Sequence, residues 1–115
     1  MAEALPTDLC RLDDIPDGEA KGFEIDQPEE IIDVIVVRRG AHVFGYRNSC
    51  PHIGTPLNWV EDDYMTLDKQ HILCAAHGAE FRIEDGYCLR GPCMGDRLEP
   101  IEVAVEDGSV VLKGL

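Results

Sequence analysis

Long hydrophobic runs are missing from this sequence of 115 residues. The aliphatic run Val34–Val37 extends back to Ile31 only across an aspartate, so it has the length of one strand. A membrane-spanning helix needs about 20 apolar residues. The first 17 residues contain a single arginine and two prolines, without the basic and apolar segments of an export signal. We therefore expect no membrane span and no export signal, and we expect the protein to act in the cytoplasm.

Basic residues are scarce. The chain has 10 lysines and arginines against 23 aspartates and glutamates, which gives a formal net charge of −13. A chain with this balance is repelled by nucleic acid phosphates and by anionic membrane surfaces, so we expect neither as a partner. An acidic surface suits either a basic protein partner or simple solubility, and the composition does not separate the two.

Helical periodicity is also lacking, and short strand-like segments recur instead. Residues 31–38 are rich in β-branched side chains, and residues 41–46 follow after a tight turn at Arg39-Gly40. Asp85-Gly86 and Asp107-Gly108 are strong hairpin signals. Further strands are expected at 9–12, 21–25, 71–74, 79–83, 87–89, 98–105 and 110–113. The sequence predicts an all-β fold in one domain, residues 1–115, large enough for its own core.

Two short segments combine cysteine with histidine. The first is Cys50-x-His52, and the second, after a gap of twenty-one residues, is Cys74-x-x-His77. Each histidine is followed closely by a glycine. Two thiolates and two imidazoles in two tight loops are a set of metal ligands, so we predict a metal site formed by both loops.

The mixed spacing distinguishes between metals. Zinc motifs mostly place two cysteines, or two histidines, a few residues apart. With one intervening residue, Cys50 and His52 can hardly converge on a single tetrahedral ion. A two-iron cluster relaxes that demand, because each loop can give its cysteine to one iron and its histidine to the other. We therefore favour a [2Fe-2S] centre, and keep a structural zinc module as the less favoured alternative.

This pattern resembles that of the Rieske iron–sulfur proteins, whose two ligand loops are followed by a third loop with Gly-Pro. The third loop matches Arg90-Gly91-Pro92-Cys93 here, and the resemblance spans roughly residues 30–112, with a cluster-binding region at about 48–95. The gap between the two ligand pairs is longer than is usual in the family. We assign the additional residues to the polar segment Trp59–Gln70.

The resemblance implies a fold of three small antiparallel sheets, with the cluster held at the tip of one subdomain by two loops. It implies that Cys50 and Cys74 bind one iron and that His52 and His77 bind the other. The residues expected to shield the cluster, or to let the backbone approach it, are Ile53, Gly54, Leu57, Gly78, Gly91 and Pro92.

Neutral imidazoles in place of two thiolates make the centre more positive and an electron easier to accept, so Rieske potentials lie at roughly −150 to +300 mV. High-potential members have a serine after the second histidine, and a disulfide joins their two loops. Gly78 and Ala79 follow the second histidine here, and the additional loop cysteines are missing. We expect a potential near the lower end of the range. Cys10, Cys88 and Cys93 are expected to be thiols, with a Cys88–Cys93 disulfide as the less favoured alternative.

As implied by the resemblance, the protein is a soluble electron carrier that is not itself an enzyme. It would pass single electrons from a flavin-dependent reductase to a terminal oxygenase, often one that hydroxylates aromatic rings. The length leaves no room for a catalytic domain, and a two-histidine, one-carboxylate iron site is not apparent. The alternative is a small Rieske subunit of a larger reductase, such as an assimilatory nitrite reductase.

Overall fold

A computed structural model describes residues 7–26, 31–49, 51, 57, 64–75, 78–91 and 95–114. Strands dominate these residues, with one short 3₁₀ helix after the first strand. The elements are β1 (Thr7–Arg11), η1 (Leu12–Asp14), β2 (Ala20–Asp26), β3 (Ile31–Arg39), β4 (His42–Arg47), β5 (His71–Leu73), β6 (Glu80–Arg82), β7 (Cys88–Arg90), β8 (Pro100–Glu106) and β9 (Ser109–Gly114). Across these described ranges, no helix has the length and apolar character needed to cross a membrane.

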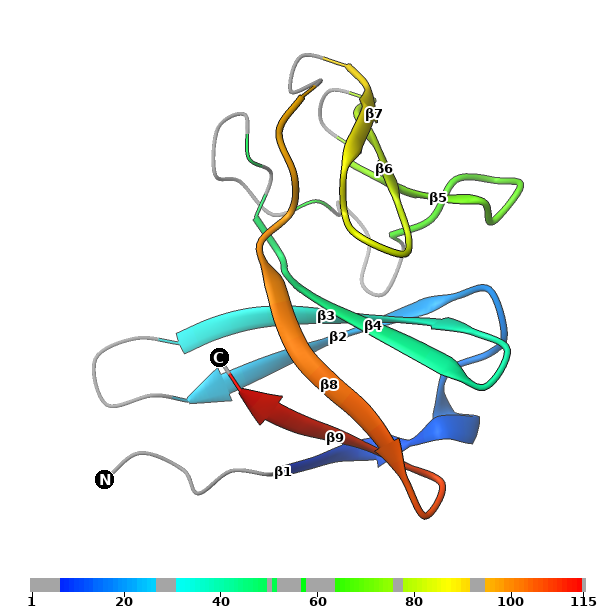
Figure 1. Ribbon diagram of the computed structural model, residues 1–115, viewed down its shortest axis with the longest axis vertical. Coiled ribbons are helices and arrows are strands. Elements are labelled where there is room, and N and C mark those ends of the chain that lie inside the picture. Colours follow the sequence, from blue (N-terminus) through cyan, green and yellow to red (C-terminus); the bar gives the residue numbers. More distant parts are fainter. Residues whose placement is uncertain are drawn as a thin grey trace.

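The strands form antiparallel sheets, which confirms the all-β prediction. One sheet has the order β1-β9-β8-β4-β3-β2, and a three-stranded sheet, β5-β6-β7, lies above it in Figure 1. The expectation of three sheets differs from the pairing observed. Gly45 and Tyr46 of β4 pair with Ile101 and Pro100 of β8, so the two larger groups of strands join into a single sheet.

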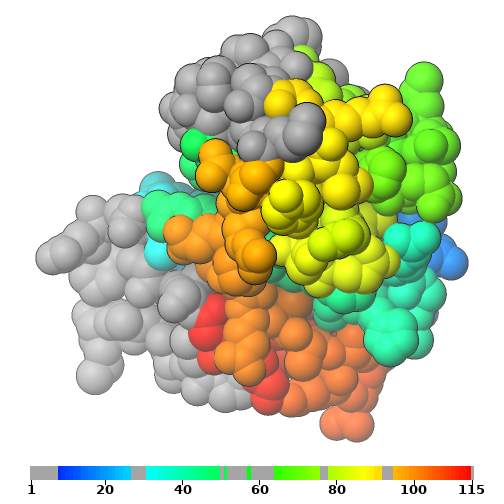
Figure 2. All heavy atoms as spheres, turned by 45° about the horizontal axis from the view of Figure 1, so that its top comes forward, coloured from blue at the N-terminus to red at the C-terminus, as the bar shows by residue number. Residues whose placement is uncertain are grey.

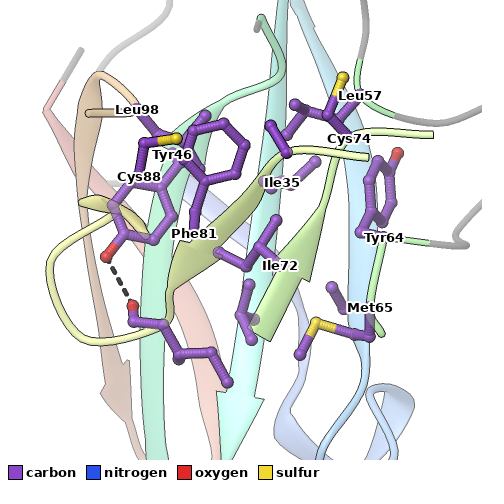
Figure 3. Close-up of a cluster of buried hydrophobic side chains, with 14 residues drawn as sticks. Ile35, Tyr46, Leu57, Tyr64, Met65, Ile72, Cys74, Phe81, Cys88 and Leu98 are labelled. Carbon is purple, nitrogen blue, oxygen red and sulfur yellow. Dashed lines mark hydrogen bonds between the residues drawn. The ribbon is translucent and has the colours of Figure 1, made fainter. Parts of the chain in front are cut away.

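Strand β3 is buried on both faces, and its two faces belong to two different cores. Ile35 and Val37 point into a core that we call the site core, which β3 shares with the small sheet. Val34 and Val36 point into a second core, between the two halves of the large sheet. Because neighbouring side chains of a strand point to opposite faces, an uninterrupted aliphatic run is what this position requires. The small sheet is thereby packed onto the large one (Figure 3).

Both predicted hairpins are present. Asp107 and Gly108 have φ of 52° and 77°, the pair of positive values that a tight two-residue turn needs. The β6–β7 loop is longer, and Asp85 organises it by accepting two bonds from Arg82, at 2.9 and 2.6 Å, and one from Tyr87 N–H at 3.0 Å. These bonds lower the pKa of Asp85 to about 2, and those from Arg82 have the largest effect. Their stabilising effect is therefore present above the unfolded pKa and is lost only as pH falls toward 2.

Tyr46 ties the large sheet to the small one. Its phenol is buried and donates to the backbone oxygen of Ile83 at 2.6 Å, across the site core (Figure 3). Burial, with the nearby charges of Asp85 and Glu84, raises the pKa of the Tyr46 phenol. The Tyr46 phenol therefore stays protonated and keeps donating this hydrogen bond over the ordinary pH range.

We expect Tyr46→Phe to lower the free energy of unfolding by about 1–2 kcal/mol, because the Ile83 carbonyl is left without its donor in a buried place. Urea unfolding followed by circular dichroism measures the change. Tyr87→Phe is the control, because Tyr87 is only partly buried and packs beneath Arg82, with the guanidinium carbon 5.6 Å from the ring centroid. Equal losses of unfolding free energy in the two variants would show that the hydrogen bond from Tyr46 to Ile83 does not itself stabilise the fold.

Candidate metal centre

Cys74 is the predicted ligand that the structure describes. It follows β5 directly and is fully buried in the site core, where Figure 3 shows its sulfur beside Leu57. The other predicted ligands and several predicted shielding residues lie outside the described residues, namely Cys50, His52, His77, Ile53, Gly54 and Pro92. No group of three or more metal-binding side chains occurs within the part of the chain that is described. The four-ligand set therefore remains a prediction.

The second ligand loop is closed by its own backbone. Cys74 N–H donates to Ala79 O at 2.8 Å, and Gly78 N–H donates to Cys74 O at 2.8 Å. Gly78 has φ of +71°, as expected for a residue that turns the chain back toward β6. The residue pair 74 and 79 therefore forms the neck of a tight loop, and the Cys74 thiol lies at one side of that neck.

The first ligand loop is attached to the second. Ala75 N–H donates to Leu57 O at 2.7 Å, and Leu57 N–H donates in turn to Asn48 Oδ1 at 2.7 Å. Asn48 N–H is bonded to Asp33 O at 2.8 Å, which anchors this chain of contacts to β3. Leu57 is fully buried, as a shielding residue should be. The two loops are thus joined next to Cys74, although their motifs are far apart in sequence.

The third loop also approaches the second. Gly91, directly after β7, has φ of +99°, and a Cβ placed there would lie 2.7 Å from the Cα of Ala79. Only glycine allows both this backbone angle and this contact. Described parts of all three predicted loops therefore meet at the neck formed by Cys74 and Ala79, where Cys74 is buried. A soft sulfur ligand at such a place fits an iron–sulfur cluster.

We expect Gly91→Ala to destabilise the protein by about 2–4 kcal/mol, because the added methyl meets both an unfavourable φ and the backbone of Ala79. Gly95→Ala is a matched control, since Gly95 has the same φ of +99° but open space around the position of its Cβ. Its cost should be about 1–2 kcal/mol. Denaturant unfolding and iron content after gel filtration measure both variants. Equal effects would show that the approach of the third loop to Ala79 contributes nothing.

The remaining cysteines and histidines have other surroundings. Cys88 is buried and its thiol donates to Arg90 O at 3.1 Å, while Cys10 is a half-buried thiol on β1 whose pKa is raised by burial. Cys93 lies outside the described residues, so the Cys88–Cys93 alternative is untested.

His42 begins β4, as expected. His71 begins β5, and its Nδ1 lies 3.1 Å from Glu80 Oε1, a cross-strand contact that the sequence did not indicate.

Two relatives resemble the chain in sequence. The cytochrome b6-f complex iron-sulfur subunit of Chlorobaculum thiosulfatiphilum is 28% identical over 99 residues, which cover 86% of this chain and 48% of that protein. The ferredoxin component of the alkene monooxygenase system of Xanthobacter autotrophicus is 28% identical over 105 residues, covering 91% and 78%. The chain thus spans about half the length of the first relative and most of the second.

Solved structures of ferredoxins share the fold. The ferredoxin of carbazole 1,9a-dioxygenase from Nocardioides aromaticivorans superposes with a TM-score of 0.77 at 22% identity, covering 97% of this chain and all of that one. The ferredoxin of Sphingomonas yanoikuyae gives 0.69 at 25% identity, covering 96% and 99%. The model of the Rieske [2Fe-2S] domain matches residues 6–107. Because this match takes in all three loops and most of the chain, the chain belongs to the Rieske [2Fe-2S] domain family.

Proposed function

We propose that this protein is a cytoplasmic carrier of single electrons and holds a Rieske-type [2Fe-2S] cluster. Cys50 and Cys74 would bind one iron, and His52 and His77 the other. The bound cluster would supply a one-electron centre. Electrons would come from a flavin-dependent reductase and go to a terminal oxygenase. The observation that supports this most strongly is the meeting of the three loops at the neck formed by Cys74 and Ala79, next to the buried side chain of Cys74.

The chain's own residues would hold and enclose the cluster. The bond from Ala75 N–H to Leu57 O keeps the two ligand loops at a fixed separation. The four predicted ligands would therefore stay in position when the cluster is reduced. Leu57 excludes water from the inner side of the site, which strengthens the effect of hydrogen bonds on the potential. Gly91 brings the third loop against the second without a side chain between them.

The kinds of relatives support a carrier in an oxygenase system. One relative is named as the ferredoxin component of an alkene monooxygenase system. A solved structure with the same fold, at a TM-score of 0.74, is described as a complex of reduced oxygenase and oxidised ferredoxin in carbazole 1,9a-dioxygenase. The other relative is named as a subunit of a larger complex, but the solved structures that share the fold over the whole chain are ferredoxins, so the alternative of a permanent small subunit is not favoured.

Metal and sulfide analysis of the purified protein tests the proposal. We expect about two irons and two acid-labile sulfides per chain, and an EPR signal that appears on reduction with dithionite. One zinc per chain without sulfide would establish the structural zinc module instead. Two irons in a protein that purifies only within a stable complex with a larger reductase would establish the subunit alternative.

A further inference from the structure

Two arginines stand apart from the other basic residues of the chain. All ten lysines and arginines are among the described residues, and most are engaged, as Arg39 is with Glu84 at 2.9 Å and Lys69 with Glu19 at 2.8 Å. Arg90 and Arg97 are exposed and form neither an ion pair nor a side-chain hydrogen bond with another described residue. These two arginines are the first and last residues of the segment 90–97, which begins with the third loop.

Arg97 lines a surface pocket of about 360 Å³ together with Arg47, Ser49, Pro51 and Glu99. The pocket forms where the end of β4 meets the segment before β8, and Arg47 N–H donates to Glu99 O at 2.9 Å there. In Figure 2 the orange chain from residue 95 onward lies next to the green residues that follow β4. Ser49 and Pro51 are the two neighbours of Cys50 in sequence. The pocket therefore borders the first ligand loop.

Arg97 gives this pocket a guanidinium group that has no ion pair with another described residue. Arg47 is already engaged, with the Glu99 carboxylate 4.0 Å from its nearest nitrogen, so Arg97 supplies the available guanidinium group. Two further carboxylates lie near Arg97. Asp96 precedes it in sequence and is exposed, and Asp85 is close enough for the charge of Arg97 to help lower its pKa. Asp85 is already bonded twice by Arg82. A guanidinium group offers paired donors that match a carboxylate. Such a place is unusual on a chain whose net charge is −13.

We propose that this pocket receives a carboxylate side chain of the redox partner and so fixes how that partner lies against the loop containing Cys50. The inference rests on the proposed function, since it assumes that a partner docks near the ligand loops. The acidic body would attract a basic partner from a distance, and the pocket would then select one orientation. An acidic residue that met a different part of this surface would instead be repelled.

Two small one-electron acceptors of opposite charge test the pocket in the intact protein. The reduced protein is mixed with anionic hexacyanoferrate(III) or with cationic hexaammineruthenium(III), and the second-order rate constant is measured by stopped flow. In each case one electron passes to the metal of the complex, which goes from the trivalent to the divalent state. Arg97→Gln should slow the anionic acceptor about tenfold at 0.1 M salt, by the Coulomb energy over about 5 Å, and should speed the cationic one.

Glu99→Gln should act in the opposite direction, because it removes a negative charge from the lining of the pocket. Lys113 and Glu106, which form an ion pair with each other, provide controls with the same change in net charge. Glu106 lies at the far end of β8, seven residues long, and therefore roughly 20 Å from Glu99. Lys113→Gln and Glu106→Gln should change either rate less than about twofold. If they match the pocket variants, only net charge matters and the pocket proposal fails.

A binding measurement that needs no electron transfer separates this inference from the proposed function. Redox-inert hexacyanocobaltate(III) is titrated into the protein as isolated, and the chemical shift of the Arg97 Nε–H is followed by NMR. A shift that Arg97→Gln removes at neighbouring amides supports the pocket, even if metal analysis rejects the cluster. Acetate and inorganic phosphate are then compared. We expect both to bind weakly, as lone groups at an exposed site do. Saturation by phosphate below about 0.1 mM would identify a free phosphate site and overturn the docking assignment.

Discussion

Cys74→Ser should purify with less than about a tenth of the iron and sulfide of the unchanged protein, and without its visible absorbance. The serine hydroxyl is not ionised at neutral pH and is a poor ligand for iron, whereas the cysteine binds as a thiolate. Because Cys74 is fully buried at the neck of its loop, no other described side chain can take its place without moving the loop. Cluster binding and folding of the loops are coupled, so the variant should also unfold at lower denaturant concentration.

Two other cysteines separate loss of a ligand from loss of a thiol. Cys88→Ser removes a thiol that is equally buried in the site core, and the new hydroxyl can still donate to Arg90 O. Cys10→Ser removes a half-buried thiol from β1, in the large sheet. Both variants should keep about two irons per chain. A Cys74 variant with full iron content would remove Cys74 from the ligand set and with it the four-residue motif.

Local signals predicted the local structure well. The aliphatic run in β3 indicated a strand, and Asp107-Gly108 indicated a tight turn because both positions need positive φ. Strand β1 was expected at residues 9–12 and is found at Thr7–Arg11, because the chain turns into η1 after Arg11. Element boundaries depend on such contacts, here the bond from Leu12 N–H to Gly108 O, which comes from the other end of the chain.

Long-range contacts are what the sequence did not predict. Two residue pairs between β4 and β8 join two expected sheets into one. No periodicity in either strand predicts this pairing. The ligand types and their spacing indicated a site formed by two loops, but they do not contain the bond from Ala75 to Leu57 that joins the loops. The same holds for the pocket of Arg47 and Arg97, whose residues are about fifty positions apart and meet only after the sheets have packed.

His77→Cys should retain some cluster and lower its reduction potential by on the order of 100 mV. A thiolate in place of a neutral imidazole adds one negative charge to the centre, so the incoming electron meets a less positive site. Centres with two imidazoles lie at about −150 mV or above, whereas those with four thiolates lie near −400 mV, and one replacement should move the potential about halfway. A redox titration followed by EPR measures the change. His42→Cys adds the same thiol at the start of β4, at the opposite end of that strand from the first ligand loop, and should leave the potential unchanged within about 20 mV. An intact cluster whose potential does not move in the His77 variant would show that His77 is not bound to iron, and the second imidazole ligand would then have to be sought elsewhere in the chain.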